Sequence, residues 1–313
     1  ITNSAIEGIS LVNQPFLDRL DFSGCKRLKT VTVDSCDKIT ELNLSNLGDL
    51  HTIRITSCPN LKSIICTNNV NLTTFNVSNC NNVEIINVSQ CTNAALTVYI
   101  VGVPNIKELN VSSTNTPNDI QVASSLPNLR TLNISNSQVS AIQYGNAAVP
   151  TYKENKIFDV SKLNLTSLSV QNAKGIHYFK FDNNRNTPFN VSGSFFVGCS
   201  NLKRVFGHIK LNGTSIFAQC GSFYIHEPKE KVEGITPDYM GEWFGSDTST
   251  EEGKTVWDNN TDLGTNFTIG TTDCRSMFKA TNCSIYDVYY FLYKCNNVTT
   301  LDSCFASAKN IKW

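Results

Sequence analysis

The chain has 313 residues, and its 26 basic and 26 acidic side chains give a formal net charge of zero. Nucleic acids and anionic membranes bind proteins through an excess of Lys and Arg, so the sequence predicts neither partner. It contains no apolar run of about 18 residues, so we expect no membrane insertion. Only 17% of the residues are charged, and abundant Asn, Ser and Thr indicate a surface of uncharged hydrogen-bonding groups.

An eleven-residue repeat begins at Ile6 and continues without a slip to the unit that starts at Val83. The unit reads L-x-x-L-x-L-x-x-(C/N), with aliphatic, aromatic or Cys side chains at the L positions and Gln14 and Leu47 as exceptions at the last position. The last two L positions are two residues apart, so both point to the same side of a short strand. We expect two units to form one coil of about 22 residues, and coils to stack about 4.8 Å apart through parallel strands.

The position after each strand predicts a ladder of small side chains that turn inward at the corner of each coil. The ladder consists of Cys25, Cys36, Cys58, Asn69, Cys80 and Cys91. We interpret the cysteines as buried free thiols, because thiols pack as small hydrophobic groups. Cβ atoms stacked about 4.8 Å apart lie outside the usual disulfide spacing, but disulfides and a metal site stay open as alternatives.

The pattern resumes after a one-residue shift near Ala95 and continues to about residue 142, with an excursion over residues 115–128 that could form a helical turn. It resembles the leucine-rich repeat superfamily in LKTVTVDSCDKI (28–39) and LRTLNISNSQV (129–139), and is most similar to the nested eleven-residue type of bacterial surface proteins. The resemblance implies a mainly β fold, a right-handed parallel β-solenoid, that serves as a scaffold for recognition.

A second unit, S-x-F followed by a small residue or Cys, appears at residues 194–199, 215–220, 276–283 and 303–308. We predict that its aromatic residues are core plugs, namely Phe196, Phe217, Phe278 and Phe305. These units are similar to the Phe-and-Cys repeats of bacterial surface leucine-rich proteins. They are more weakly similar to tail and fibre proteins of phages that infect gut bacteria.

Residues 227–270 break both patterns, which predicts an inserted loop. Long loops in compact domains are often functional. Its large apolar side chains either pack against the stack or form a platform for a sugar or protein partner; they are Tyr239, Met240, Trp243, Phe244 and Trp257. The expected segments are a regular leucine-rich-repeat solenoid (1–148), an irregular repeat continuation (149–226), this loop, and C-terminal Phe/Cys repeats (271–313).

No motif for catalysis, a cofactor or a metal is present. The four histidines lie in separate segments, and the sequence contains no nucleophile elbow, phosphate loop or dinucleotide fingerprint. Asp258, Asn260 and Asp262 alternate as in a calcium loop, but Ile269 occupies the place of the closing Glu. The outward strand positions hold scattered acids, such as Asp34, without the carboxylate pair of a glycosidase. We therefore predict no catalytic residues, no cofactor and no metal.

These observations favour a non-enzymatic, surface-displayed recognition or adhesion scaffold that binds a protein or glycan on a facing surface. The strand face would cover about 500 Å², less than the roughly 800 Å² of a standard interface, so we expect the inserted loop to supplement it. We expect an extracellular location, on a bacterial cell or a virion, with any signal or anchor outside this fragment. One alternative is a structural or receptor-binding part of a phage tail or fibre, in contact with other virion subunits. A minor alternative is a glycan-cleaving enzyme.

Overall fold

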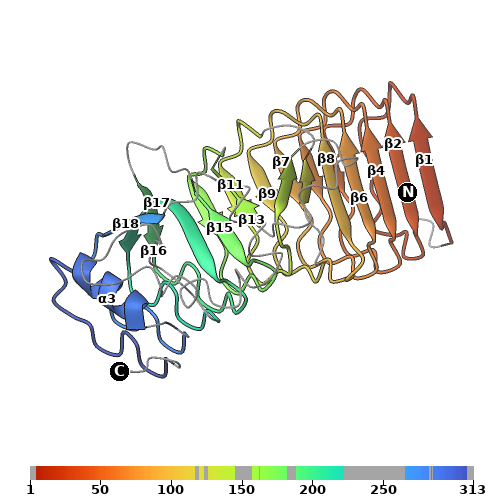
Figure 1. Cartoon of the computed structure of the whole chain (residues 1–313). Coiled ribbons are helices and arrows are strands. Elements are labelled where there is room, and N and C mark those ends of the chain that lie inside the picture. Colours follow the sequence, from red (N-terminus) through yellow and green to blue (C-terminus); the bar gives the residue numbers. More distant parts are fainter. Residues whose placement is uncertain are drawn as a thin grey trace, which may run out of the picture. The chain divides into compact units, whose positions relative to one another are not determined.

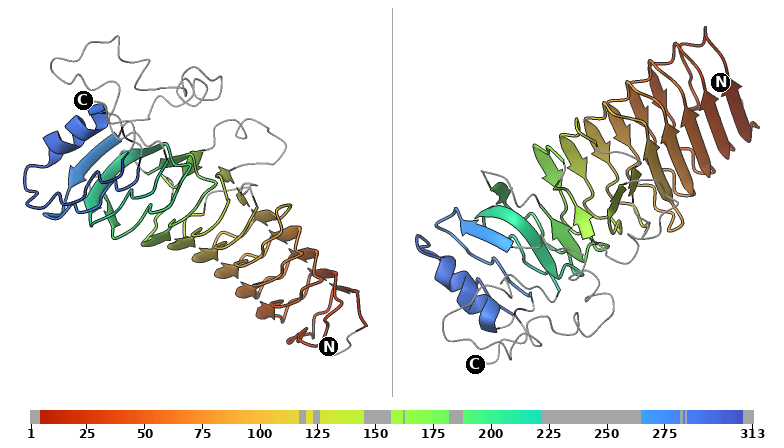
Figure 2. Two further views of the ribbon diagram at one scale, coloured as in Figure 1. Left: turned by 90° about the horizontal axis from the view of Figure 1, so that it is seen from below. Right: turned by 45° about the horizontal axis from the view of Figure 1, so that its top comes forward.

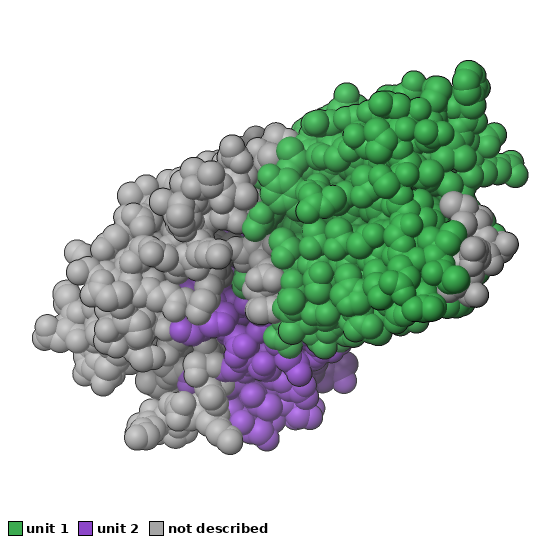
Figure 3. All heavy atoms as spheres, turned by 90° about the vertical axis from the view of Figure 1, so that its right-hand side faces the viewer, with its two compact units in different colours: residues 1–149, 162–170 green, residues 150–161, 171–313 purple. Residues whose placement is uncertain are grey.

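The computed structural model describes most of the chain in two compact units. The described residues are 5–116, 120–122, 126–144, 157–161, 163–181, 188–221, 265–281, 283 and 285–308. Unit 1 comprises residues 1–149 and 162–170, and unit 2 comprises residues 150–161 and 171–313 (Figure 3). The division into four segments stays a prediction beside this division into two units.

Unit 1 contains a seven-stranded parallel sheet, here called sheet A (Figure 1). In spatial order its strands are β1 (Gly8–Val12), β2 (Thr30–Asp34), β4 (Thr52–Thr56), β6 (Thr74–Ser78), β8 (Thr97–Val101), β10 (Ile120–Val122) and β12 (Ile142–Tyr144). Thr30 lies opposite Thr52, so neighbouring strands are one coil of 22 residues apart. All pairs in this sheet run in the same direction, as Figure 2 shows.

A second parallel sheet, sheet B, uses the other half of each coil. Its strands are β3 (Glu41–Asn43), β5 (Ser63–Ile65), β7 (Ile85–Asn87), β9 (Glu108–Asn110), β11 (Thr131–Asn133) and β14 (Ser167–Ser169). Leucine-rich-repeat coils of about 22 residues therefore form a parallel β-solenoid, which confirms the predicted fold class. The helical turn expected over residues 115–128 was wrong where the structure describes it, because Ile120 and Val122 alternate with Gln121 as a strand of sheet A.

The core of unit 1 lies between the two sheets and consists of the three L positions of each repeat. Leu28, Val31 and Val33 are fully buried, whereas Thr30 and Thr32 point outward and are at least partly exposed. Each fully buried aliphatic side chain contributes about 1.5–3 kcal/mol relative to an exposed one. The core of the first coil is less well covered, because β1 has a neighbouring strand on one side only.

The corners of the coils use a backbone conformation that the sequence analysis missed. Except at Cys25, the residue before each ladder position has a positive φ, and the same corner position of other coils has it too; the series is Asn13, Ser35, Asn46, Ser57, Asn68, Asn79, Gln90, Gly102, Ser113 and Asn136. The backbone N–H then donates to the next coil, as from Ser57 to the Ser78 carbonyl at 3.0 Å. Asn and Gly tolerate a positive φ better than most residues do. Their recurrence one residue before the ladder positions is therefore the sequence signal for these corners.

Asparagine side chains link neighbouring coils at the next corner position. Asn60 Nδ2 donates to the Asp37 carbonyl at 2.7 Å, and the same bond to the preceding coil recurs from Asn71, Asn82, Asn105 and Asn128. Each bond satisfies a corner carbonyl that has no partner in a strand ladder. The high asparagine content is therefore partly explained by the stacking of the coils.

Unit 2 is built around a nine-residue strand, β17 (Arg204–Asn212). It pairs in parallel with β15 (Tyr178–Lys180), β16 (Phe189–Ser192) and β18 (Thr265–Ile269), and β15 also pairs with β13 (Ile157–Asp159). The helix α3 (Ile285–Lys294) is the only helix in the part of the chain that the structure describes. Residues 265–270, which the sequence analysis placed in the inserted loop, belong to this stack, because Gly270 also donates to the Leu211 carbonyl.

The predicted core plugs form a stack of parallel phenylalanine rings in unit 2. Phe196 and Phe217 lie 5.5 Å apart, Phe217 and Phe278 5.5 Å, and Phe278 and Phe305 5.3 Å. The first three rings are buried, but Phe305 is only half-buried, because no further ring of this series follows it among the described residues. Phe217 N–H donates to the Met277 carbonyl, so the stack continues directly across the interval 222–264.

Candidate functional site

The side chains of the predicted ladder are all fully buried in unit 1. Cys25, Cys36, Cys58, Cys80 and Cys91 are free thiols, as are the other seven cysteines of the chain, and all are described. Cys58 Sγ donates to the Thr56 carbonyl at 3.2 Å. Asn69 accepts from Leu47 N–H and donates to the Leu44 carbonyl, both at 2.8 Å. These side chains hold the corners of the coils and have no route to a ligand.

Burial makes most of these thiols weak nucleophiles. In unit 2, burial raises the pKa of Cys199 and that of Cys304 to about 12 each. Hydrogen bonds from neighbouring thiols lower the pKa of Cys80, Cys91 and Cys295, and of these only Cys295 is half-buried while the other two are fully buried. The thiolate is the reactive form, so Cys295 is the thiol most open to chemical modification.

We expect a thiol titration at pH 8 to label Cys295 first in the native protein and all 12 cysteines after unfolding without a reductant. An aromatic disulfide reagent gives the count by absorbance. The Cys295→Ser variant should abolish the early reaction and leave 11 slow thiols, one fewer than the 12 of the natural chain. If denaturant alone exposed only a few thiols, the cysteines would be disulfide-bonded and the free-thiol interpretation would be wrong.

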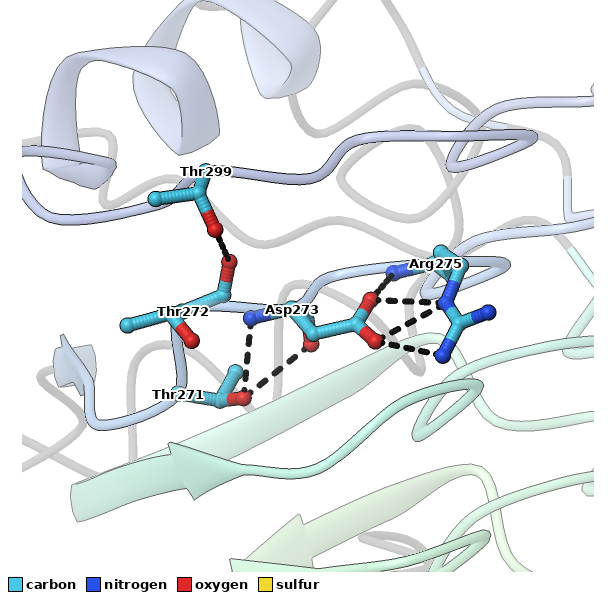
Figure 4. A network of polar contacts seen from close by, with 5 residues as sticks. All are labelled: Thr271, Thr272, Asp273, Arg275 and Thr299. Carbon is cyan, nitrogen blue, oxygen red and sulfur yellow. Dashed lines mark hydrogen bonds and ion pairs between the residues drawn. The ribbon is translucent and has the colours of Figure 1, made fainter.

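A network of polar contacts in unit 2 is structural (Figure 4). Arg275 Nη2 contacts Asp273 Oδ2 at 2.7 Å, and Thr271 Oγ1 accepts from the Asp273 N–H at 3.1 Å. The hydrogen bond from Arg275 lowers the pKa of Asp273, which therefore stays ionised at neutral pH. A carboxylate paired in this way does not act as a general acid. The backbone of Asp273 also forms an isolated parallel β-bridge with that of Thr300. Together with the side-chain contacts, this bridge holds the turn in place.

Within the described residues, no cluster of three His, Cys, Asp or Glu side chains could hold a metal ion. No helix found there has the length and apolarity that crossing a bilayer requires. The large apolar side chains of the predicted binding loop lie outside the described residues: Tyr239, Met240, Trp243, Phe244 and Trp257. Their role stays a prediction, and in unit 1 the candidate surfaces that the structure describes are the outer faces of the two sheets.

The outer face of sheet B uses its asparagines internally. Asn43, Asn87, Asn110 and Asn133 end their strands, and each Oδ1 accepts the backbone N–H two residues later at 3.0–3.1 Å. These Asx turns account for the recurrent Asn-x-Ser sequence. The remaining outward positions include Ile65 and Ile85, which are half-buried. Sheet B also carries outward polar side chains, among them Glu41, Ser63 and Glu108, but its asparagines are used within the protein.

The outer face of sheet A is broader, because its first five strands have five residues each and those of sheet B have three. Its side chains on the first strands form three rows, which are Thr30, Thr52, Thr74 and Thr97; Ser10, Thr32, Arg54, Asn76, Tyr99 and Gln121; and Val12, Asp34, Thr56, Ser78 and Val101. Asp34 accepts a hydrogen bond from Ser35 at 3.0 Å. Among the described residues, no other side chain of these rows has a hydrogen-bond or ion-pair partner. This face is regular and mostly polar, with Val12 and Val101 as its apolar members.

The comparisons with known proteins agree with the repeat. A family model described as "At1g61320/AtMIF1, LRR domain" matches residues 1–183, more than half of the 313-residue chain. A leucine-rich repeat protein from Bacteroides ovatus ATCC 8483, known from a crystal structure, is similar with 17% identity and a TM-score of 0.31; the match covers 65% of this chain and 55% of that protein. A search of curated proteins gave no significant match. The family match, which extends over the regular coils described above, shows that this chain belongs to the leucine-rich repeat family.

Proposed function

We propose that the chain is a non-enzymatic recognition scaffold that binds a protein or a glycan through the outer face of sheet A. Leucine-rich repeat domains generally bind proteins, and solenoids present extended surfaces suited to that role. The observation that carries the proposal is the set of outward polar side chains without partners. On β2, β4, β6 and β8 their inward neighbours are buried, so the backbone beneath them is held in place.

The chemistry of the same face supports a binding role and gives catalysis little support. Its charged groups among the described residues are Asp34 and Arg54, and Asp34 already accepts a hydrogen bond from Ser35. Glycosidases need two carboxylates about 5–10 Å apart, one of them with a raised pKa. The described rows of sheet A offer one carboxylate. Recognition is the function that such a surface can perform.

Adhesion at an extracellular surface is the setting we propose for this recognition. Five strands of five residues give a face of roughly 24 by 17 Å, or about 400 Å², which is half the area that one partner contributes to a standard interface. Binding by one copy would be moderate, and display of several copies on one surface would raise the avidity. The aromatic residues of the predicted loop are a proposed supplement to this area.

The alternative is a structural or receptor-binding part of a phage tail or fibre. In that role the repeats would supply length, and the outer faces of the coils would supply contacts with neighbouring subunits.

The recognition proposal predicts that charges on sheet A abolish binding, whereas matched charges on sheet B do not. Thr30→Glu/Thr97→Glu changes outward positions of β2 and β8, and the control Ser63→Glu/Thr131→Glu changes those of β5 and β11. Each pair leaves two strands between its sites. The probe is an array of purified cell-surface glycoproteins and free glycans, and we expect dissociation constants of roughly 10 μM for the natural chain.

The sheet A variant should weaken binding at least tenfold, while the sheet B control stays within about twofold, because each added charge must be desolvated in the complex. Circular dichroism verifies that both variants fold. Equal losses in both variants would argue against a specific face. Binding that survives both variants but disappears when residues 226–262 are replaced by a short linker would move the site to the inserted segment.

A further inference from the structure

The central row of sheet A carries a continuous line of hydrogen-bonding side chains. Register places Ser10, Thr32, Arg54, Asn76, Tyr99 and Gln121 opposite one another on successive strands. Parallel strands are about 4.8 Å apart, so the line presents one polar side chain for about each 4.8 Å. A sugar ring in an extended oligosaccharide has a similar length. A linear glycan lying along the stack could therefore meet one side chain per ring.

Asn76 shows that this row is not used for the protein's own structure. The tripeptide Asn-Val-Ser occurs at residues 76–78 in sheet A and at residues 87–89 in sheet B. In sheet B the Asn87 Oδ1 accepts the Ser89 N–H at 3.0 Å and the strand ends there. In sheet A the strand continues to Ser78, and the Asn76 Oδ1 is shielded from water without any partner. An unpaired amide oxygen costs free energy, so no hydrogen bond of this oxygen within the protein accounts for the asparagine at this position.

The neighbours of Asn76 in the row are suited to sugars. Arg54 is exposed on β4 and has no ion-pair or hydrogen-bond partner within the described structure. Its guanidinium can donate two parallel hydrogen bonds to adjacent hydroxyls. A side-chain amide can also form two such bonds, one as a donor and one as an acceptor. Tyr99 on β8 is half-exposed and offers a ring on which the apolar face of a sugar can pack.

Charge and area distinguish between the possible ligands. The described face has one cation, Arg54, and one anion, Asp34, so it has no net charge to attract an acidic polysaccharide. The surrounding Thr30, Thr52 and Thr74 add neutral hydroxyls and methyl groups. An area of about 400 Å² is small for a protein partner but accommodates four to six sugar rings over roughly 24 Å.

We propose that the ligand of this face is a neutral oligosaccharide, which lies along the central row and contacts Arg54, Asn76 and Tyr99. The assignment rests on the proposed function, because it names the ligand class of the same surface. Rows of unpaired donors and acceptors, one aromatic ring and balanced charge make the surface complementary to a chain of uncharged hydroxyl groups.

The test compares neutral and acidic oligosaccharides of four to six sugars, by calorimetry with the full chain. The neutral probes are hexose and N-acetylhexosamine oligomers, and the acidic probes are uronic-acid and sialylated oligomers of the same lengths. We expect at least one neutral probe to bind with a dissociation constant of about 0.1–1 mM. Arg54→Ala and Tyr99→Ala should each weaken it at least fivefold, while Tyr99→Phe retains most of the binding because it keeps the ring.

Glu41→Ala, at an exposed outward position of sheet B, is the control and should leave binding unchanged. Thermal melts verify that each variant folds. Tighter binding of acidic probes, or equal binding by all variants, would overturn the assignment. If no neutral probe binds, but Thr30→Glu/Thr97→Glu abolishes binding to a protein on the array, then recognition by sheet A stands and the ligand class is wrong. If neither glycans nor proteins bind, both proposals fail.

Discussion

Replacing Cys58 with Arg should unfold the regular coils of unit 1. The Cys58 side chain is fully buried, and its backbone N–H donates to the Cys80 sulfur of the next coil at 3.4 Å. An arginine there would place a bulky charge without a partner between stacked coils. We expect a loss of roughly 5 kcal/mol or more, at the upper end of what single substitutions cause. Far-UV circular dichroism during urea unfolding measures it.

Two matched variants separate charge from size and position. Cys58→Ser keeps a small donor for the Thr56 carbonyl and should cost about 1–2 kcal/mol. Val70→Arg introduces the same charge at a corner residue that is 45% exposed, and should change the stability by no more than about 0.5 kcal/mol. A Cys58→Arg protein that melts like the natural chain would show that this sulfur faces solvent in solution.

The repeat of unit 1 was predictable because one constraint sets it. Leu28, Val31 and Val33 must all reach the same core, and each later coil repeats their offsets, so the sequence period equals the structural period. The positive-φ corners were missed because the analysis followed side chains that point inward. The exposed Asn and Ser residues at those corners carried the signal, through backbone conformation rather than through burial.

Unit 2 was harder to predict, because tertiary packing decides its local structure. The segment IYDVYYFLYK forms α3, although Ile, Val, Tyr and Phe favour strands. Its Val288 and Phe291 are three residues apart and both buried, and the Phe291 ring lies 4.9 Å from Phe278. Burial on this one face outweighs the propensity of the other residues. The sequence does not reveal where Phe278 lies relative to this segment, so the helix could not be predicted from it.

Only part of the candidate site could be predicted from the sequence. The outward rows of sheet A follow from the strand period, and Asp34 was recognised as outward. Which face is free to bind could not be predicted, because Asn76 and Asn87 begin identical tripeptides. The difference lies in whether the strand continues past the asparagine, and that depends on the conformation of the whole coil.

Phe217→Ala should have the second large effect, a loss of about 3–5 kcal/mol in unit 2. The Phe217 ring lies between Phe196 and Phe278, 5.5 Å from each, so its removal leaves a cavity and breaks two stacked contacts. In a stack of repeats, an interior contact also couples the coils on both sides. The change should therefore lower the stability of the segments before and after the interval 222–264 together.

Two further phenylalanines test this explanation. Phe305 is half-buried and has one stacked neighbour, Phe278, so Phe305→Ala should cost about half as much as Phe217→Ala. Phe16 in unit 1 is 84% exposed, and Phe16→Ala should be nearly neutral. Hydrogen exchange resolves where stability is lost, and we expect faster exchange in both β17 and β18 for Phe217→Ala. Faster exchange in β18 alone would mean that the ring stack does not join the coils across the insertion.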